Sequence, residues 1–267
     1  MRGRVLVVAG SDSGGGAGIQ ADIKTISVLD AYAATAITAL TAQNTEGVFG
    51  VLPIPPEFIR RQIEVVLDDI GADAIKTGML HDAAVIEAVI AVVQERAPAT
   101  PIVVDPVMVA KGGARLIEPE AIDALKRRLI SRAEIVTPNL PEAEILCGST
   151  IGSVAEMQAA GEALLALGCR AALVKGGHLP GETVSDVLVT PGGGVRIWES
   201  PRIATRHTHG TGCTLASAIA AGLAQSLGIE SAVERARNYV QSAIANAPGL
   251  GRGHGPLDHL HPLRATS

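Results

Sequence analysis

Residues 208–214 read Thr-His-Gly-Thr-Gly-Cys-Thr, and the apolar run LASAIAAGLAQSL follows directly. This pattern predicts a short turn that opens into a helix, because Gly210 and Gly212 lack Cβ atoms and let a ligand come close to the backbone. The first N–H groups of a helix have no partner within it and carry positive potential, so such an end can bind a phosphate group. The alternative is a glycine-rich turn that only places an apolar helix beneath a sheet, since short glycine motifs are weak signals.

The composition limits the class of protein. The chain has 267 residues, of which 47% are hydrophobic, and no linker interrupts them, so we expect one domain over residues 1–267. The net charge of −5 and the lack of a Lys/Arg run argue against nucleic acid or an anionic membrane as a partner. No apolar stretch reaches the length of a membrane span. Three cysteines without metal-ligand spacing suit a reducing, cytoplasmic location.

Short apolar runs alternate with amphipathic segments along most of the chain. This alternation predicts a three-layer α/β/α fold with a mainly parallel central sheet and helices on both faces. Two segments at 184–190 and 195–198, split by Pro191 and three glycines, predict an antiparallel hairpin at one edge. The expected strands are 4–9, 33–42, 74–78, 101–105, 134–138 and 171–177, and the expected helices are 57–70, 82–96, 119–130, 141–146, 153–167 and two between 211 and 247.

Polar side chains follow several of these expected strands. Asp105 ends one strand, Asn139 and Glu142 follow the next, and Lys175 ends a third. Ligands of parallel sheets bind beyond the carboxyl ends of the strands, so these residues are candidates for a site that includes the 208–214 turn. Each also has an ordinary interpretation: a turn cap for Asp105, a helix cap with its N3 partner for Asn139 and Glu142, and a solvated Lys175.

Seven segments together resemble the hydroxymethylpyrimidine/phosphomethylpyrimidine kinases of thiamine biosynthesis, a family with the ribokinase-like fold. They are AGSDSGGGAGIQADIKT (9–25), TALTAQNT (38–45), KTGML (76–80), VVDPVMVAKGG (103–113), TPNLPEAE (137–144), LVKGGH (173–178) and THGTGCT (208–214). The resemblance implies ATP-dependent phosphorylation of 4-amino-5-hydroxymethyl-2-methylpyrimidine to its monophosphate and then to the diphosphate. It also implies a homodimer.

By the same resemblance, five residues would contact the pyrimidine. The carboxylate of Asp22 could accept from the exocyclic amine, and the amide of Gln43 can both donate and accept. Gly10 would allow close approach, while Met79 and Val107 would form the walls. Core packing is the ordinary alternative for Met79.

The resemblance assigns the remaining residues to ATP and Mg²⁺. The turn residues Gly210, Thr211, Gly212 and Cys213 would hold the transferring phosphoryl group, and Lys175 would pair with the phosphates. Asp105 and Glu142, with Asn139, would organise Mg²⁺ largely through waters. Gly177 and His209 would complete the ATP site, and His209 could instead only orient the turn. Lys111, Gly112 and Gly113 would form a lid, or else an ordinary surface loop.

Cys213 stands where many ribokinase-like sugar kinases carry an aspartate as general base. A free thiol titrates near 8.5, and we expect the helix N-terminus to lower that pKa. The second phosphorylation acts on a phosphate whose second pKa is about 6, so only the alcohol of the first step would need a base.

Two other functions fit the same residues. One is a pyridoxal or pyridoxine kinase of the same superfamily, because pyridoxine also presents a ring hydroxymethyl group. The other is a catalytically silent relative that binds the pyrimidine, although the presence of Lys175, Glu142 and Gly210 argues against it.

Overall fold

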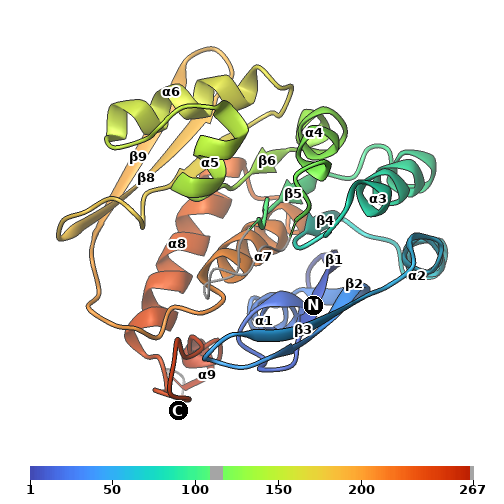
Figure 1. Ribbon diagram of the computed structural model, residues 1–267, viewed down its shortest axis with the longest axis horizontal. Coiled ribbons are helices and arrows are strands. Elements are labelled where there is room, and N and C mark those ends of the chain that lie inside the picture. Colours follow the sequence, from blue (N-terminus) through green and yellow to red (C-terminus); the bar gives the residue numbers. More distant parts are fainter. Residues whose placement is uncertain (109–116, 265–267) are drawn as a thin grey trace.

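The computed structural model describes residues 1–108 and 117–264, which form three layers around one sheet (Figure 1). Within these residues the sheet has nine strands in the order β3-β2-β1-β4-β5-β6-β7-β8-β9. Lys111, Gly112 and Gly113 lie outside the described residues. The strands are β1 (Arg4–Asp12), β2 (Tyr32–Gln43), β3 (Val48–Pro53), β4 (Ala74–Thr77), β5 (Ile102–Val104), β6 (Ile135–Val136), β7 (Ala172–Lys175), β8 (Thr183–Thr190) and β9 (Gly194–Pro201).

Local signals in the sequence begin several of the helices. Asp82 accepts a hydrogen bond from the Val85 N–H, and Ser153 accepts one from the Glu156 N–H, which are N-caps of the expected kind. The helices are α1 (Gly18–Val28), α2 (Pro56–Asp69), α3 (Ala83–Arg96), α4 (Ala121–Ala124), α5 (Leu140–Cys147), α6 (Val154–Leu165), α7 (Thr211–Ala224), α8 (Ile229–Ala245) and α9 (His261–Arg264). A π-helical turn (Leu125–Leu129) and a 3₁₀ turn (Ile130–Arg132) extend α4.

Alternating side chains of the sheet build two cores. On β1, Leu6 and Val8 pack with α2 to α6, whereas Val5 and Val7 pack with α1, α7 and α8 on the opposite face. Full burial of one such aliphatic side chain contributes about 1.5–3 kcal/mol to folding. The mainly parallel sheet with helices on both faces is therefore confirmed.

Antiparallel strands close both edges of the sheet. The predicted hairpin is present as β8 and β9, and α6 packs over it (Figure 1). At the opposite edge β3 pairs antiparallel with β2, and this second antiparallel edge was not predicted. The reason is that β3 is short, contains Gly50 and has largely exposed side chains, so it carries no burial pattern.

The carboxyl ends of the parallel strands lie along the same edge of the sheet. Strands β1, β4, β5, β6 and β7 all run in the same direction. The segments that follow them therefore emerge together, as expected for a ligand site. In the part of the chain that the structure describes, none of the helices combines the length and the apolar character that crossing a membrane requires.

Candidate active site

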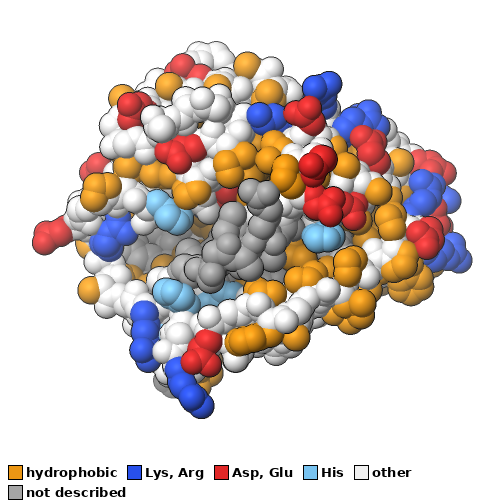
Figure 2. All heavy atoms as spheres, viewed as in Figure 1, with side chains coloured by type: hydrophobic (Ala, Val, Ile, Leu, Met, Phe, Trp, Pro, Cys, Tyr) orange, Lys and Arg blue, Asp and Glu red, His pale blue; other side chains and the backbone are white. Residues whose placement is uncertain are grey.

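A cavity of about 910 Å³ lies at the carboxyl ends of the parallel strands. Figure 2 shows histidine side chains near the middle of one face of the molecule. The size is within the range of small-molecule sites, about 300–1,000 Å³. The cavity brings together every predicted site residue except Asp22, namely Gly10, Gln43, Met79, Asp105, Val107, Asn139, Glu142, Lys175, Gly177, His209, Gly210, Thr211, Gly212 and Cys213.

The predicted turn does open into a helix at the cavity. Gly210 has φ 82°, and a Cβ atom there would lie 1.8 Å from the Gly16 carbonyl oxygen, so only glycine fits. No side chain caps α7. Among the described residues, no acceptor is found for the N–H groups of Gly212 and Cys213. These two donors are therefore available to an anion.

Lys175 and Asp105 lie directly beside this turn. The Lys175 Nζ donates to Asp105 Oδ1 at 3.2 Å. A Cβ atom built on Gly212 would lie 3.2 Å from Lys175 Nζ and 3.5 Å from Asp105 Oδ2. Although burial opposes its charge, Asp105 and Glu142 raise the pKa of Lys175, so the side chain is a cation. The turn, the cation and the carboxylate form one cluster.

Glu142 has two roles that the sequence left as alternatives. It forms a capping box with Asn139: Glu142 N–H donates to Asn139 Oδ1 at 3.0 Å, and Asn139 N–H donates to Glu142 Oε2 at 2.8 Å. It also lines the cavity. Burial raises the pKa of Glu142 to about 7, with Lys175 opposing that shift and Asp105 adding to it. Asp105 and Glu142 both raise the pKa of Lys175, and the buried Lys76 ammonium also interacts with Asp105.

The Cys213 thiol differs from the expectation. We expected the helix N-terminus to lower its pKa, but burial raises the pKa of Cys213 to about 12, even though the nearby ammonium of Lys76 opposes this shift. The thiol is therefore protonated at neutral pH. It is not a thiolate formed before the substrate arrives.

Asp22 does not line the cavity, and its expected direct contact with the substrate stays a prediction. It lies in α1, and both of its carboxylate oxygens are 3.0 Å from Lys76 Nζ. Ser217 donates to the same carboxylate at 2.6 Å. Both members of this ion pair are fully buried. Lys76, which the sequence analysis did not single out, lines the cavity in place of Asp22.

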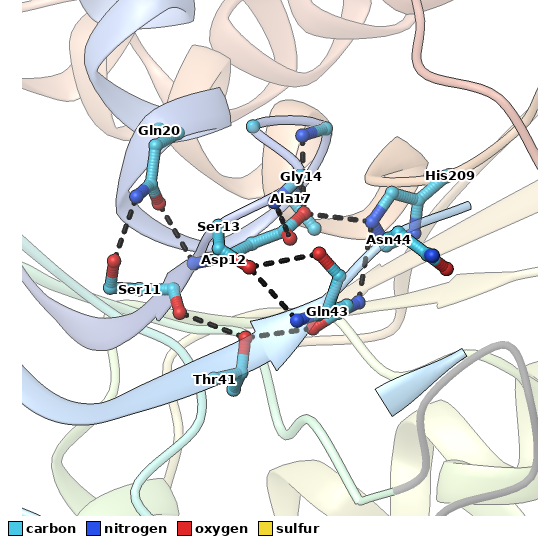
Figure 3. Close-up of polar contacts among 12 residues, drawn as sticks. Ser11, Asp12, Ser13, Gly14, Ala17, Gln20, Thr41, Gln43, Asn44 and His209 are labelled. Atoms are coloured by element: carbon cyan, nitrogen blue, oxygen red, sulfur yellow. Dashed lines mark hydrogen bonds and ion pairs between the residues drawn. The ribbon is translucent and has the colours of Figure 1, made fainter. Parts of the chain in front are cut away.

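Elsewhere on the cavity wall, Gln43 contacts His209, which belongs to a hydrogen-bond network centred on Asp12 (Figure 3). Asp12 Oδ1 accepts from Gly14 N–H at 2.8 Å, and Oδ2 accepts from Ala17 N–H at 2.8 Å. The His209 Nε2 lies 2.9 Å from the same Oδ2. Asp12 thus connects the glycine-rich loop after β1 with the 208–214 turn. It is a second residue that the sequence analysis missed.

A third wall of the cavity comes from the C-terminal half of the chain. Val184, Ile203, Val240 and Ile244 contribute apolar surface there. Beside them the Arg237 guanidinium donates to Asp186 Oδ2 at 2.7 Å. These four residues make this part of the cavity wall apolar, and no short motif in the sequence marks them.

Comparisons with known proteins identify relatives of this chain by sequence. The sequence profile of phosphomethylpyrimidine kinase matches residues 12–258. A hydroxymethylpyrimidine/phosphomethylpyrimidine kinase of Bacillus subtilis is 48% identical over 257 residues, which are 96% of this chain and 94% of that protein. A thiamine biosynthesis bifunctional protein of Geobacter sulfurreducens is 51% identical over 97% of this chain, but the chain spans only about half (52%) of that protein.

A solved structure provides the same comparison in three dimensions. The pyridoxal kinase of Bacillus subtilis, determined as an ADP complex, superposes with a TM-score of 0.91. It is 37% identical to this chain, and the alignment covers 99% of both chains. The whole layered architecture, and not only the cavity, is therefore shared with this kinase.

Proposed function

The chain belongs to the phosphomethylpyrimidine kinase family of ATP-dependent enzymes with a ribokinase-like fold, and we propose how its cavity serves that activity. The substrate is 4-amino-5-hydroxymethyl-2-methylpyrimidine, which is phosphorylated to its monophosphate and then to the diphosphate in thiamine biosynthesis. The single observation that carries the residue roles is the contact of the Gly212 position with both Lys175 and Asp105.

The transferring phosphoryl group sits between the turn and Lys175. The free N–H groups of Gly212 and Cys213 hold its oxygens, and Thr211 and Gly210 shape the turn. Lys175 neutralises charge as the group moves, which is what phosphoryl transfer requires of a protein. The ATP chain passes Asn139, Gly177 and His209, and the adenine lies against the apolar wall of Val184, Ile203, Val240 and Ile244.

Mg²⁺ fits the acidic side of this cluster. Asp105 and Glu142 offer two carboxyl groups beside Lys175, and oxygen ligands of this kind suit Mg²⁺. Among the described residues there is no group of three or more ligating side chains. This agrees with a cation held mainly by phosphate oxygens and water, because Mg²⁺ keeps several waters when bound. When bound, the ion would neutralise charge on the phosphates of ATP.

The pyrimidine lies against Gly10, Met79 and Val107, with Gln43 at its polar edge. Release of ADP tests the whole assignment. With ATP and Mg²⁺, the pyrimidine alcohol and its monophosphate should both support ADP release, and removing Mg²⁺ should stop it. Faster turnover of pyridoxal would instead favour the second candidate, a pyridoxal kinase, to which the structural similarity also extends. Binding without turnover would indicate a silent relative.

Cys213→Ala should slow phosphorylation of the alcohol about tenfold and change phosphorylation of the monophosphate less than threefold. A positioned base contributes about 10²–10⁴, but the thiol is protonated, so its effect is expected below that range. Steady-state rates with the two substrates, at saturating ATP, measure the difference. Equal losses in the two steps would assign Cys213 to the cavity wall only.

We also propose a homodimer through the β3 edge of the sheet, and a cytoplasmic location that three free cysteines support. Phe49 is 72% exposed, Leu52 is 62% exposed and Phe58 is 58% exposed. Phe49 and Leu52 lie on β3, and Phe58 lies in α2, which follows β3 in the chain. Neighbouring apolar residues of this size are unusual on a surface that stays in water.

Phe49→Glu together with Leu52→Glu should weaken dimerisation about 100-fold, because two charges would be buried at the interface. Sedimentation equilibrium measures the change. Val195→Glu with Ile197→Glu is the matched control, since these exposed residues lie on β9 at the opposite edge. A dimer that survives the β3 changes and dissociates with the β9 changes would move the interface to the hairpin.

A further inference from the structure

The Gln43 amide lies between partners from two different segments (Figure 3). One end is 3.1 Å from Thr41 Oγ1, and the other is 3.4 Å from His209 Nε2. The backbone of Gln43 is fixed too, because its N–H donates to Ser13 Oγ at 2.9 Å and its carbonyl accepts from that hydroxyl at 2.8 Å. The two ends of a glutamine amide have the same shape, so its partners decide which end is the oxygen.

Thr41 decides one end. Its hydroxyl has a single proton and lies 3.0 Å from the Ser11 carbonyl oxygen, which can only accept. When this proton is directed to Ser11 and not to the Gln43 amide 3.1 Å away, Thr41 Oγ1 can only accept from Gln43. The amide nitrogen of Gln43 then faces Thr41.

His209 decides the other end independently. Its Nε2 lies 2.9 Å from Asp12 Oδ2. Burial opposes ionisation of Asp12, but hydrogen bonds from His209, Ala17 and Gly14 outweigh it and lower the pKa of the carboxyl. An ionised carboxylate only accepts, so His209 Nε2 carries the proton. It cannot also accept from Gln43, and hence the amide oxygen faces His209. Both partners give the same assignment, which reverses the amide ends drawn in Figure 3.

An amide held in this way offers one free N–H and one free oxygen lone pair, side by side. Such an amide binds a ring nitrogen acceptor next to an exocyclic amine, as it does on the edge of adenine. We propose that Thr41, His209 and Asp12 are positioning residues that fix the Gln43 amide, so that the site selects a 4-aminopyrimidine over a 4-oxopyrimidine. In the oxo compound the donor and acceptor of this edge are exchanged. The proposal rests on the proposed function, because that supplies the aminopyrimidine.

The test compares binding of the aminopyrimidine alcohol and its 4-oxo analogue by calorimetry, without ATP. Wild-type protein should prefer the amino compound by at least about 100-fold, because the oxo compound leaves buried polar groups unpaired. Thr41→Val removes one partner and should lower this ratio about tenfold. Thr41→Ser keeps the hydroxyl and should keep the ratio. Thr41→Val with His209→Phe removes both partners and should lower the ratio further, with a gain in affinity for the oxo compound.

A merely structural role would weaken binding of both compounds equally. An unchanged ratio in Thr41→Val, or a wild-type protein that binds the two compounds within threefold, overturns the proposal. Should the double variant not fold, Thr41→Val and Thr41→Ser decide the matter between them. Amino-selective binding without ADP release would overturn the proposed function while leaving this positioning role in place.

Discussion

Lys175→Met is expected to lower kcat/KM for ATP about 1,000-fold in both phosphorylation steps, within the range of a cation that acts on a transferring phosphoryl group. The reason is positional, since Lys175 Nζ is 3.2 Å from Asp105 Oδ1 and 3.2 Å from a Cβ built on Gly212. Both steps move the same phosphoryl group of ATP through the same place. ADP release with the alcohol and with the monophosphate should therefore fall together.

Loss of Lys175 also leaves a nearly buried carboxylate without its partner, which can cost about 3–5 kcal/mol of stability. Lys175→Met with Asp105→Asn removes both charges and should recover the thermal midpoint while remaining inactive. Lys126→Met, on the helical segment far along the chain from the turn, is the control for loss of a lysine. A folded Lys175→Met protein within tenfold of wild-type activity would contradict the assignment.

The sequence was sufficient for most of the sheet and for the turn that faces the site. Within the expected strands, the runs 5–9 and 101–104 are apolar throughout, which is typical of strands covered on both faces. The strand β3 was missed because an exposed edge strand has no burial pattern to reveal it. Whether residues 1–267 are a single domain stays a prediction, which the continuous sheet of the described residues supports.

What the sequence could not provide were the partners of buried charges. Lys76 stands within an apolar strand pattern, and its partner Asp22 is 54 residues away on a helix. A pattern of alternation identifies the strand but not the carboxylate that neutralises such a lysine. The two residues are fully buried together because each compensates the cost of desolvating the other. Asp22 therefore fixes Lys76, which lines the cavity.

The prediction that the pKa of Cys213 is lowered was wrong for a related reason. A helix N-terminus favours a thiolate, and the sequence correctly places Cys213 there. The sequence does not show how far the fold desolvates the sulfur of Cys213, a half-buried residue at the cavity wall. Desolvation is the larger effect and raises the pKa of the thiol to about 12. Position along a helix was predictable, whereas burial depends on segments distant in the chain.

Gly212→Ala is expected to lower kcat about 10²–10³-fold, the loss that follows when one donor of an oxyanion site is misplaced. The added methyl group would occupy the space beside Lys175 Nζ and Asp105 Oδ2, at 3.2 Å and 3.5 Å, which the phosphoryl oxygens need. Gly212 lies within α7 and its φ is not positive, so alanine meets no backbone strain. Alanine in a helix is favoured over glycine by about 0.5–1 kcal/mol. The thermal midpoint should thus stay level or rise while activity falls.

A lower kcat at an unchanged or higher thermal midpoint would show that the site is blocked and the fold is intact. Gly228→Ala is the matched control, because Gly228 is the N-cap of α8, the next helix, and a Cβ there would meet nothing within 4 Å. It should leave both kcat and the thermal midpoint nearly unchanged. Binding of the aminopyrimidine at the Gln43 end should also persist in Gly212→Ala, since the methyl group faces Lys175 and Asp105. A Gly212→Ala enzyme with wild-type kcat would mean that the phosphoryl group does not approach this turn, and the roles of Lys175 and Asp105 would have to be reassigned with it.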